Sequence, residues 1–275
     1  MPSIRKELAE YGLTPRKRWG QHFLIDRNIL NKVIRTADLE KRDVVLEVGP
    51  GLGEMTLAMA RQVKKVIAVE IDQKLVKILR EKTEETLNIE VVHGDILKID
   101  FAELLHQEGQ QFKVVANLPY QISTPLLFRF IESREVFSAL TLMLQREVAE
   151  RMVAPPGRKE YGPLSVFVQS VSDLSIRFFI KPSAFFPAPK VESAVVHMVW
   201  KERPVVGLEE AWFKKVVRGC FGYRRKRLVN ALRHSDIPLP ADLEQRMEKI
   251  GVDGLRRPET LTIQELARLA DAIRP

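Results

Sequence analysis

With 275 residues, of which 45% are hydrophobic and 29% charged, the chain is long enough for one large globular domain and a smaller one. The single cysteine, Cys220, excludes an intrachain disulfide, and the five scattered histidines do not have the spacing of a Cys/His zinc site, so we expect no metal. The net charge of +8 favours a polyanionic partner, and because no segment approaches the length of a membrane span we expect a soluble, cytoplasmic protein.

Residues 1–25 form a basic, irregular N-terminal segment that includes Arg5-Lys6 and Arg16-Lys17-Arg18-Trp19. An amphipathic helix is predicted from its N-cap Asp26 to Arg35. From Asp43 onward, strands and helices alternate. Apolar runs predict seven strands, and the intervening periodicity predicts helices at 55–61 and 73–82. The strands are expected at 44–48, 66–69, 89–92, 112–116, 140–144, 176–180 and 194–200.

Continuous apolar strands separated by helices are typical of a parallel sheet that is covered on both faces, so we predict an α/β fold. The composition shifts at residues 201–204, which we interpret as a linker. Beyond it, helices predicted at 208–218, 224–233, 241–249 and 263–273 indicate a small all-α domain. The expected organisation is a catalytic domain at 26–200 and a helical C-terminal domain at 205–275.

A glycine-rich loop, Glu47 to Gly53, lies between the first strand and its helix. Its three glycines are evenly spaced and follow a carboxylate, unlike the dinucleotide pattern G-x-G-x-x-G. Glu70 ends the second strand, where it can accept from both hydroxyls of a ribose, and Asp95 follows the third, where it can accept from an adenine amino group. No phosphate-binding lysine or loop accompanies them. We therefore predict S-adenosylmethionine as the ligand; the alternative, a tight turn without a ligand, is disfavoured by the two strand-end carboxylates.

The tetrad Asn117-Leu118-Pro119-Tyr120 follows the fourth strand. The Asn117 side-chain oxygen and the Leu118 carbonyl can accept both hydrogens of an exocyclic amine, and the Tyr120 ring can stack on the base that carries it. Taken alone, the four residues also fit a strand followed by a Pro turn. Because ligands bind at the carboxyl ends of parallel strands, we expect the methyl donor and this tetrad to face one cavity.

Two further segments are candidates for the site. The Pro-rich segment 185–193 can hold Phe185 or Phe186 against the open face of a bound base. The alternative is a rigid strand connection whose phenylalanines belong to the core. Residues 20–24 can cap the donor pocket, and His22 within them is either a structural contact or a cofactor contact.

Together these motifs resemble the KsgA/RsmA ribosomal RNA adenine dimethyltransferases, which share a fold with the Erm methyltransferases. The resemblance covers nearly the whole chain, and the stretches 145–165 and 221–232 are similar to the KsgA branch. It implies a Rossmann-like S-adenosylmethionine-dependent methyltransferase sheet with a small all-α C-terminal domain. The implied activity is dimethylation of N6 of two adjacent adenines near the 3′ end of small-subunit (16S) ribosomal RNA, in small-subunit biogenesis.

The resemblance also implies roles for individual residues. Asn117, Leu118 and Tyr120 would be catalytic, with Phe185 as the second stacking ring. Cofactor contacts are expected at His22, Leu24, Gly49, Gly51, Glu70, Ile71, Asp95, Ile96 and Asn117.

The chain departs from the usual family pattern at His22 and at Gln121, where the family usually or often has Asn. A neutral imidazole can still form a hydrogen bond, so only that single contact is affected. Rival interpretations are an Erm-like large-subunit methyltransferase, a DNA N6 methylase, and a non-catalytic RNA-binding assembly factor that kept the fold. The KsgA-like stretch 145–165 argues against the first two, and the intact donor and acceptor motifs argue against the third.

A flipped adenine must come from RNA that is held by its backbone. The basic N-terminal segment and eight basic residues beyond it are the candidate phosphate contacts, although a solvated surface charge is the alternative for each of them. The eight are Arg146, Arg151, Arg158, Lys159, Arg224, Arg225, Lys226 and Arg227. We expect small-subunit ribosomal RNA or the immature small subunit as the partner, no membrane partner, and a monomer.

Overall fold

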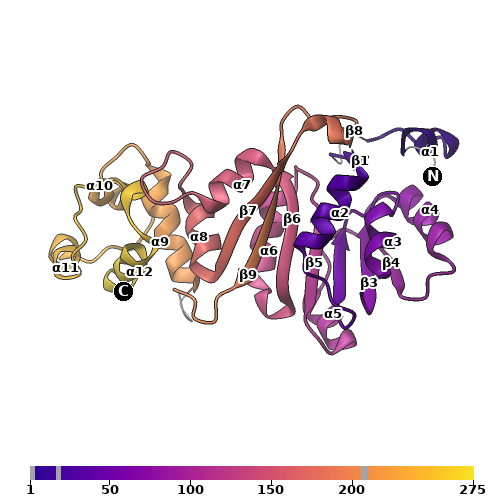
Figure 1. The fold of residues 1–275 in the computed structure, drawn as a ribbon. Coiled ribbons are helices and arrows are strands. Elements are labelled where there is room, and N and C mark those ends of the chain that lie inside the picture. Colours follow the sequence, from indigo (N-terminus) through magenta and orange to yellow (C-terminus); the bar gives the residue numbers. More distant parts are fainter. Residues whose placement is uncertain (1–3, 17–19, 206–209) are drawn as a thin grey trace. The chain divides into compact units, whose positions relative to one another are not determined.

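The computed structural model describes residues 4–16, 20–205 and 210–275, and the chain divides into two compact units (Figure 1). The first unit takes residues 1–149 and 174–199, and the second takes 150–173 and 200–275. The second unit therefore contains the predicted helical domain together with residues 150–173. Lys17, Arg18 and Trp19 of the predicted basic segment, and the start of the helix predicted at 208–218, lie outside the described residues.

A seven-stranded sheet with the order β4–β3–β2–β5–β6–β9–β7 forms the centre of the first unit. Parallel neighbours within it are β2–β3, β3–β4, β2–β5 and β5–β6, whereas β9 pairs antiparallel with β6, so the sheet is mixed. All seven predicted strands are present. Their bounds are β2 Val44–Val48, β3 Lys65–Glu70, β4 Ile89–His93, β5 Phe112–Asn117, β6 Phe137–Gln145, β7 Ser172–Ile180 and β9 Ser193–Trp200.

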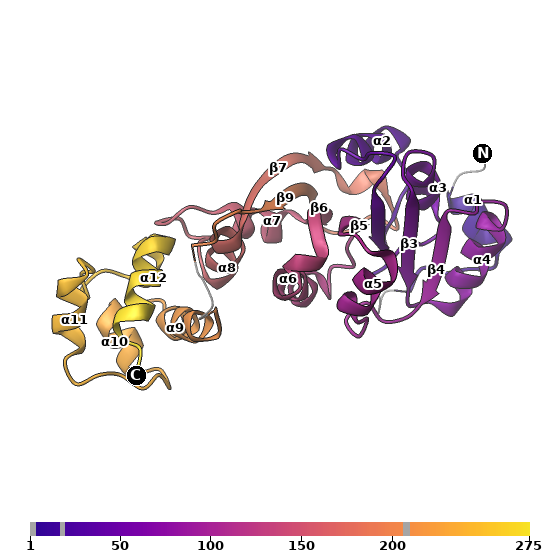
Figure 2. The ribbon, with the colours of Figure 1, turned by 90° about the horizontal axis from the view of Figure 1, so that it is seen from below.

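Helices cover both faces of this sheet, with α2 on one side and α6 on the other (Figure 2). The predicted N-cap of α2 is confirmed, because the Asp26 carboxylate accepts the N–H groups of Asn28 and Ile29 at 2.8 and 3.1 Å. The helices are α2 Arg27–Thr36, α3 Glu54–Ala60, α4 Gln73–Thr83, α5 Phe101–Glu108 and α6 Ser123–Glu132.

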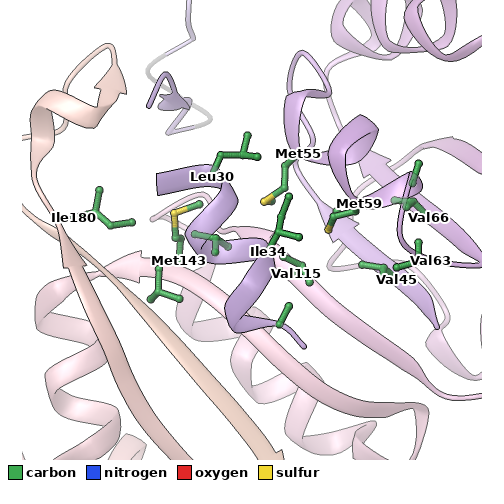
Figure 3. Packing of buried hydrophobic residues seen from close by; sticks show 14 of the residues in the cluster. Leu30, Ile34, Val45, Met55, Met59, Val63, Val66, Val115, Met143 and Ile180 are labelled. Atoms are coloured by element: carbon green, nitrogen blue, oxygen red, sulfur yellow. The ribbon is translucent and has the colours of Figure 1, made fainter. Parts of the chain in front are cut away.

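The core on the α2 side contains Leu30, Ile34 and Met59 from the helices and valines from the sheet (Figure 3). On the opposite face, four phenylalanines pack in stacked, tilted and edge-to-face pairs, with ring centroids 5.1–6.5 Å apart. They are Phe101, Phe112, Phe130 and Phe137. Burial on both faces explains why β2 and β3 are mostly apolar, whereas the edge strand β4 is only partly buried.

Several elements of the first unit have no counterpart in the sequence prediction, among them α1, Ile4–Glu10, and the helices α5 and α6. Another is a two-stranded antiparallel sheet in which β1, Phe23–Leu24, pairs with β8, Phe185–Phe186. This pairing brings the N-terminal segment to the Pro-rich segment 185–193.

The second unit is helical. Its contacts include the Trp212 Nε1–H bond to the Ala270 carbonyl at 2.7 Å, which joins α9 to α12. The helices are α8 Pro163–Val171, α9 Glu210–Gly222, α10 Leu228–Arg233, α11 Leu243–Lys249 and α12 Ile263–Ala272, and α7, Arg146–Val153, begins in the first unit. Among the described residues no helix combines the length and apolarity that a membrane span requires.

The helix predicted at 224–233 is wrong at its start, since α10 begins at Leu228. Arg227 has an extended backbone, with φ −63° and ψ 152°. Within the predicted range 224–233, the first residue with a buried side chain is Leu228. Its N–H donates to the Arg256 carbonyl at 2.8 Å. The four preceding basic residues therefore lie in a turn rather than on the helix.

Candidate functional site

A cavity of about 280 Å³ opens at the carboxyl ends of the parallel strands, within the first unit. All nine residues expected at the cofactor line it, and so do Leu118 and Tyr120. The donor loop and the tetrad thus face one cavity, as β5 lies next to β2 in the sheet. None of the described residues that line the cavity is Lys or Arg.

The glycine loop owes its path to positive φ angles, which are 66° at Gly49, 60° at Gly51 and 84° at Gly53. A Cβ atom at Gly51 would lie 3.0 Å from Cε1 of Phe23, and one at Gly53 would clash with Cδ1 of Leu79. Side chains at these positions would be both strained and crowded. The loop backbone is therefore left open to a ligand in the cavity.

Glu70 fastens this loop to the end of β3. Its carboxylate accepts the N–H groups of Ile71 and Asp72, each at 2.9 Å, and that of Gly51 at 3.2 Å. Burial raises the pKa of Glu70 to about 7, and the three backbone donors oppose that rise. The carboxylate is a buried acceptor that gains charge near neutral pH.

Glu47 lies behind the loop and is fully buried. The Thr56 hydroxyl donates to its carboxylate at 2.6 Å. Burial raises the pKa of Glu47 to about 8, and the nearby Glu70 charge raises it further. The raised pKa favours the neutral form of Glu47 near pH 7, which limits the negative charge beside the carboxylates of Glu70 and Asp95.

Asp95 and two isoleucines form the remaining donor side of the cavity. The Asp95 carboxylate accepts the Leu97 N–H at 3.0 Å, which fixes its side chain. Ile71 is 44% exposed and lies with Ile96 in the cavity lining. An exposed apolar side chain next to a carboxylate suits a flat ring that carries an amino group. In the part of the chain that the structure describes, no group of three or more His, Cys, Asp or Glu side chains is arranged to hold a metal ion.

The Asn117 side chain is oriented by the N-terminal segment. Its Nδ2 donates to the backbone carbonyl of His22 at 2.9 Å, so its Oδ1 is the atom that can accept from a ligand. The following residue is fixed as well, since the Leu118 N–H donates to the Met143 carbonyl at 2.9 Å. The two predicted acceptor groups therefore lie on a well-anchored stretch of backbone.

Tyr120 is anchored to the Pro-rich segment, because its hydroxyl forms a 2.7 Å hydrogen bond with Oγ of Ser193. The His22 ring lies 5.4 Å from the Tyr120 ring, tilted by 30°, and its Nδ1 donates to the Pro187 carbonyl at 2.6 Å. Burial raises the pKa of Tyr120, which keeps the phenol neutral. Ser193 is not among the site residues predicted from the sequence, where its only signal is its place at the end of the 185–193 motif.

The structure differs from the prediction at Phe185. Its ring is 1% exposed, packs in the core with Leu30 and Met143, and does not line the cavity. The reason is the β1–β8 pairing, which fixes the direction of the segment and places successive side chains on opposite sides. This is the core position that the alternative interpretation described, and it leaves His22, Phe23 and Tyr120 as the aromatic groups among the described residues that line the cavity.

Helix α1 covers part of the donor side and was not foreseen. Ile4 lines the cavity, and Leu8 is buried against Leu52 of the glycine loop. Lys82 of α4 donates both to the Glu7 carboxylate and to the Leu52 carbonyl, each at 2.6 Å. One lysine thus joins the N-terminal helix to the donor loop.

The predicted phosphate contacts separate into paired and exposed groups. In the first unit Arg5 lies over the Phe186 ring and Arg16 pairs with Asp72. Arg146 pairs with Glu192 at 2.7 Å. These three cations therefore already have partners within the protein.

In the second unit, Arg224 donates to the Arg158 and Lys159 carbonyls, and Lys226 bonds to His234 at 2.7 Å. Arg224 and Lys226 thus hold the surrounding backbone and side chains. Arg151 is half-buried, and its carbonyl accepts from Ser165. The residues with exposed side chains are Arg158, Lys159, Arg225 and Arg227.

The chain is similar to known proteins over nearly its whole length. A family model described as ribosomal RNA adenine dimethylase matches residues 12–274. A Geobacter metallireducens protein named ribosomal RNA small subunit methyltransferase A is 43% identical over 265 residues, which cover 95% of this chain and 96% of that protein.

Solved structures give the same result for the fold. A dimethyladenosine transferase from Plasmodium falciparum is 29% identical with a TM-score of 0.77, covering 90% of this chain and 96% of that one. The 23S rRNA methyltransferase ErmE is 26% identical with a TM-score of 0.70, covering 91% of this chain and 99% of that one. The predicted methyltransferase fold with a helical C-terminal part is confirmed.

Proposed function

The chain belongs to the ribosomal RNA adenine dimethylase family, and from this premise we propose that it dimethylates N6 of adenines in small-subunit (16S) ribosomal RNA. The expected targets are two adjacent adenines near the 3′ end of that RNA. The reaction would take place on immature small subunits in the cytoplasm, as a step of small-subunit biogenesis. The protein would act as a monomer, because one chain carries both the donor and the acceptor groups.

The donor side of the cavity suits S-adenosylmethionine. Glu70 would accept from the ribose hydroxyls and Asp95 from the adenine amino group, while Gly49 and Gly51 allow close approach of the backbone. The lack of Lys and Arg among the described lining residues argues against a cofactor with phosphates. When bound, S-adenosylmethionine supplies an electrophilic methyl group on a positively charged sulfur.

The hydrogen bond from Asn117 to the His22 carbonyl carries the proposal for the acceptor side. It directs Oδ1 of Asn117 toward an incoming amine, and the Leu118 carbonyl would accept the second hydrogen. Two acceptors on the amino group of adenine localise a lone pair that is otherwise delocalised into the ring. Tyr120 would stack on the base, so that orientation and electrostatic preorganisation supply most of the rate.

Exposed cations of the second unit would hold the RNA backbone. Arg158, Lys159, Arg225 and Arg227 have exposed side chains. The half-buried Arg224, next to Arg225 in the sequence, ties their two loops together by donating to the Arg158 and Lys159 carbonyls. Phosphate contacts of this kind position an RNA without reading its sequence.

Methyl incorporation into unmodified small subunits, with mapping of the modified bases, tests this function. We expect four methyl groups per subunit on two adjacent adenines and none on large subunits. Methylation of large-subunit RNA would instead favour the Erm-like alternative. Tight binding of small subunits without any incorporation would favour a non-catalytic assembly factor.

A further inference from the structure

An exposed aromatic ring lies at the edge of the sheet and takes no part in the donor and acceptor sides. Phe179, the penultimate residue of β7, is 46% exposed, and the Arg146 guanidinium lies 4.7 Å from its ring centroid. Val191 is exposed to the same extent. The preceding residue on the strand, Phe178, faces the other way and contacts Lys32 of α2. The core therefore uses Phe178 but not Phe179.

A short series of contacts joins this ring to the cavity. Tyr120 lines the cavity and bonds to Ser193. Glu192, the residue before Ser193, accepts the Arg146 N–H on its carbonyl at 2.9 Å and the Arg146 guanidinium on its carboxylate at 2.7 Å. The same guanidinium covers Phe179. The ring and its guanidinium thus lie beside the anchor of Tyr120.

The charge pattern around Phe179 suits a nucleic acid. Arg146 is paired with Glu192, and this pairing weakens Arg146 as a phosphate contact. The pairing also fixes the flat guanidinium group of Arg146, which can still stack on a base. Lys181, two residues after Phe179 in the chain, is exposed as well. An exposed aromatic ring with a guanidinium on it and a lysine close by in the chain combines the stacking and cationic groups that bind single-stranded RNA.

We propose that Phe179 and Arg146 stack the base of the nucleotide adjacent to the target adenine. This inference rests on the proposed function. When the target base enters the cavity, it no longer stacks on the adjacent base of the RNA. The adjacent base therefore exposes the ring face that the target base had covered. Phe179 supplies a replacement surface outside the cavity. For two adjacent adenines, the second would be held there while the first reacts.

A binding cycle tests the proposal without methyl transfer. The full-length protein is titrated with a synthetic RNA that spans the adenine pair, and with the same RNA that has an abasic nucleotide beside the target. For the wild type we expect the abasic RNA to bind about 10-fold more weakly. Phe179→Leu should weaken binding of the intact RNA by a similar factor and show no further loss with the abasic RNA, because ring and base form one contact.

Three variants complete the test. Phe179→Trp should bind as the wild type does, and Arg146→Lys, which keeps the charge but not the flat group, should lose affinity. Phe178→Leu is the matched control and should leave the cycle unchanged. The proposal is overturned if Phe179→Leu binds intact RNA normally, if it remains sensitive to the abasic site, or if Phe178→Leu has the same effect. A wild-type protein that incorporates no methyl groups would overturn the proposed function instead, while the cycle would still decide the stacking.

Discussion

Asn117 donates a hydrogen bond from Nδ2 to the backbone carbonyl of His22 at 2.9 Å, across 95 residues of sequence. The bond fixes which end of the amide faces the cavity. In Asn117→Asp a carboxylate would replace the donor and repel that carbonyl. We expect kcat to fall by about 10²- to 10³-fold in both Asn117→Asp and Asn117→Ala. The affinity of either variant for small subunits should be nearly unchanged. Gln121→Asn, in the same loop, should retain activity; near-normal turnover of Asn117→Ala would remove the catalytic role.

The hydrogen bond between Tyr120 and Ser193 should matter for methyl transfer through the orientation of the ring. We expect Tyr120→Phe and Ser193→Ala each to lower kcat/KM by about 3- to 10-fold, the usual effect of one hydrogen bond. The double variant should be no worse than either single variant, since both remove the same bond. Multiplying losses would show that the two residues act independently. Tyr120→Ala, which also removes the ring, should be far less active than Tyr120→Phe.

Cofactor affinity should depend on pH through Glu70. Its pKa is about 7 in the folded protein, and the ionised form is the better acceptor for ribose hydroxyls. Affinity should therefore rise with pH through 7, with S-adenosylhomocysteine binding about 10-fold more weakly at pH 6 than at pH 8. Calorimetry over this range measures the effect, and Glu70→Gln should bind weakly with a flat profile.

Glu47 titrates in the same range, with a pKa of about 8, and serves as the control. Because Thr56 donates to Glu47, the variant Glu47→Gln keeps an acceptor for that bond. It should retain the pH dependence of binding. The opposite result, a pH profile of binding that is flattened by Glu47→Gln and kept by Glu70→Gln, would show that Glu47 and not Glu70 is the titrating group.

Strands and strand ends were predictable because each depends on a local pattern. Apolar runs predicted all seven strands; Glu70 and Asn117 each end one of them, and Asp95 lies two residues after the end of β4. The structure brings these residues into one cavity because the parallel strands end at the same edge of the sheet.

Contacts between side chains far apart in sequence had no such signal. Ser193 and Tyr120 are 73 residues apart, and nothing in either local pattern indicates the other. The direction of Phe185 depends on a two-residue pairing with β1 that is too short to be read from periodicity. Arg224 to Arg227 have good helix propensity, and only the burial of Leu228 places the helix start after them.

Lys82 should stabilise both α1 and the donor loop. It is 18% exposed and bonds to the Glu7 carboxylate and the Leu52 carbonyl. In Lys82→Met the Glu7 carboxylate loses its partner, so we expect a loss of about 1–3 kcal/mol in the free energy of unfolding and weaker binding of S-adenosylhomocysteine. Glu7→Gln/Lys82→Met should recover part of the stability, because no unpaired charge remains. Lys6→Met, which breaks an exposed pair with Glu10, is the control and should change little. Equal stability of all these variants in thermal unfolding would contradict the coupling.

Binding of RNA should weaken steeply with added salt if the exposed cations of the second unit contact phosphates. Arg225 and Arg227 are exposed, and each phosphate contact that is removed should lower the slope of log K against log salt by about 1. We expect Arg225→Gln and Arg227→Gln to show this reduction while methylation at saturating RNA stays near that of the wild type. Arg233, which pairs with Glu244 at 2.8 Å on the same unit, gives the control Arg233→Gln, whose slope should be unchanged. A slope that is flat in the wild type, or equal in all variants, would mean that these cations are solvated surface charges.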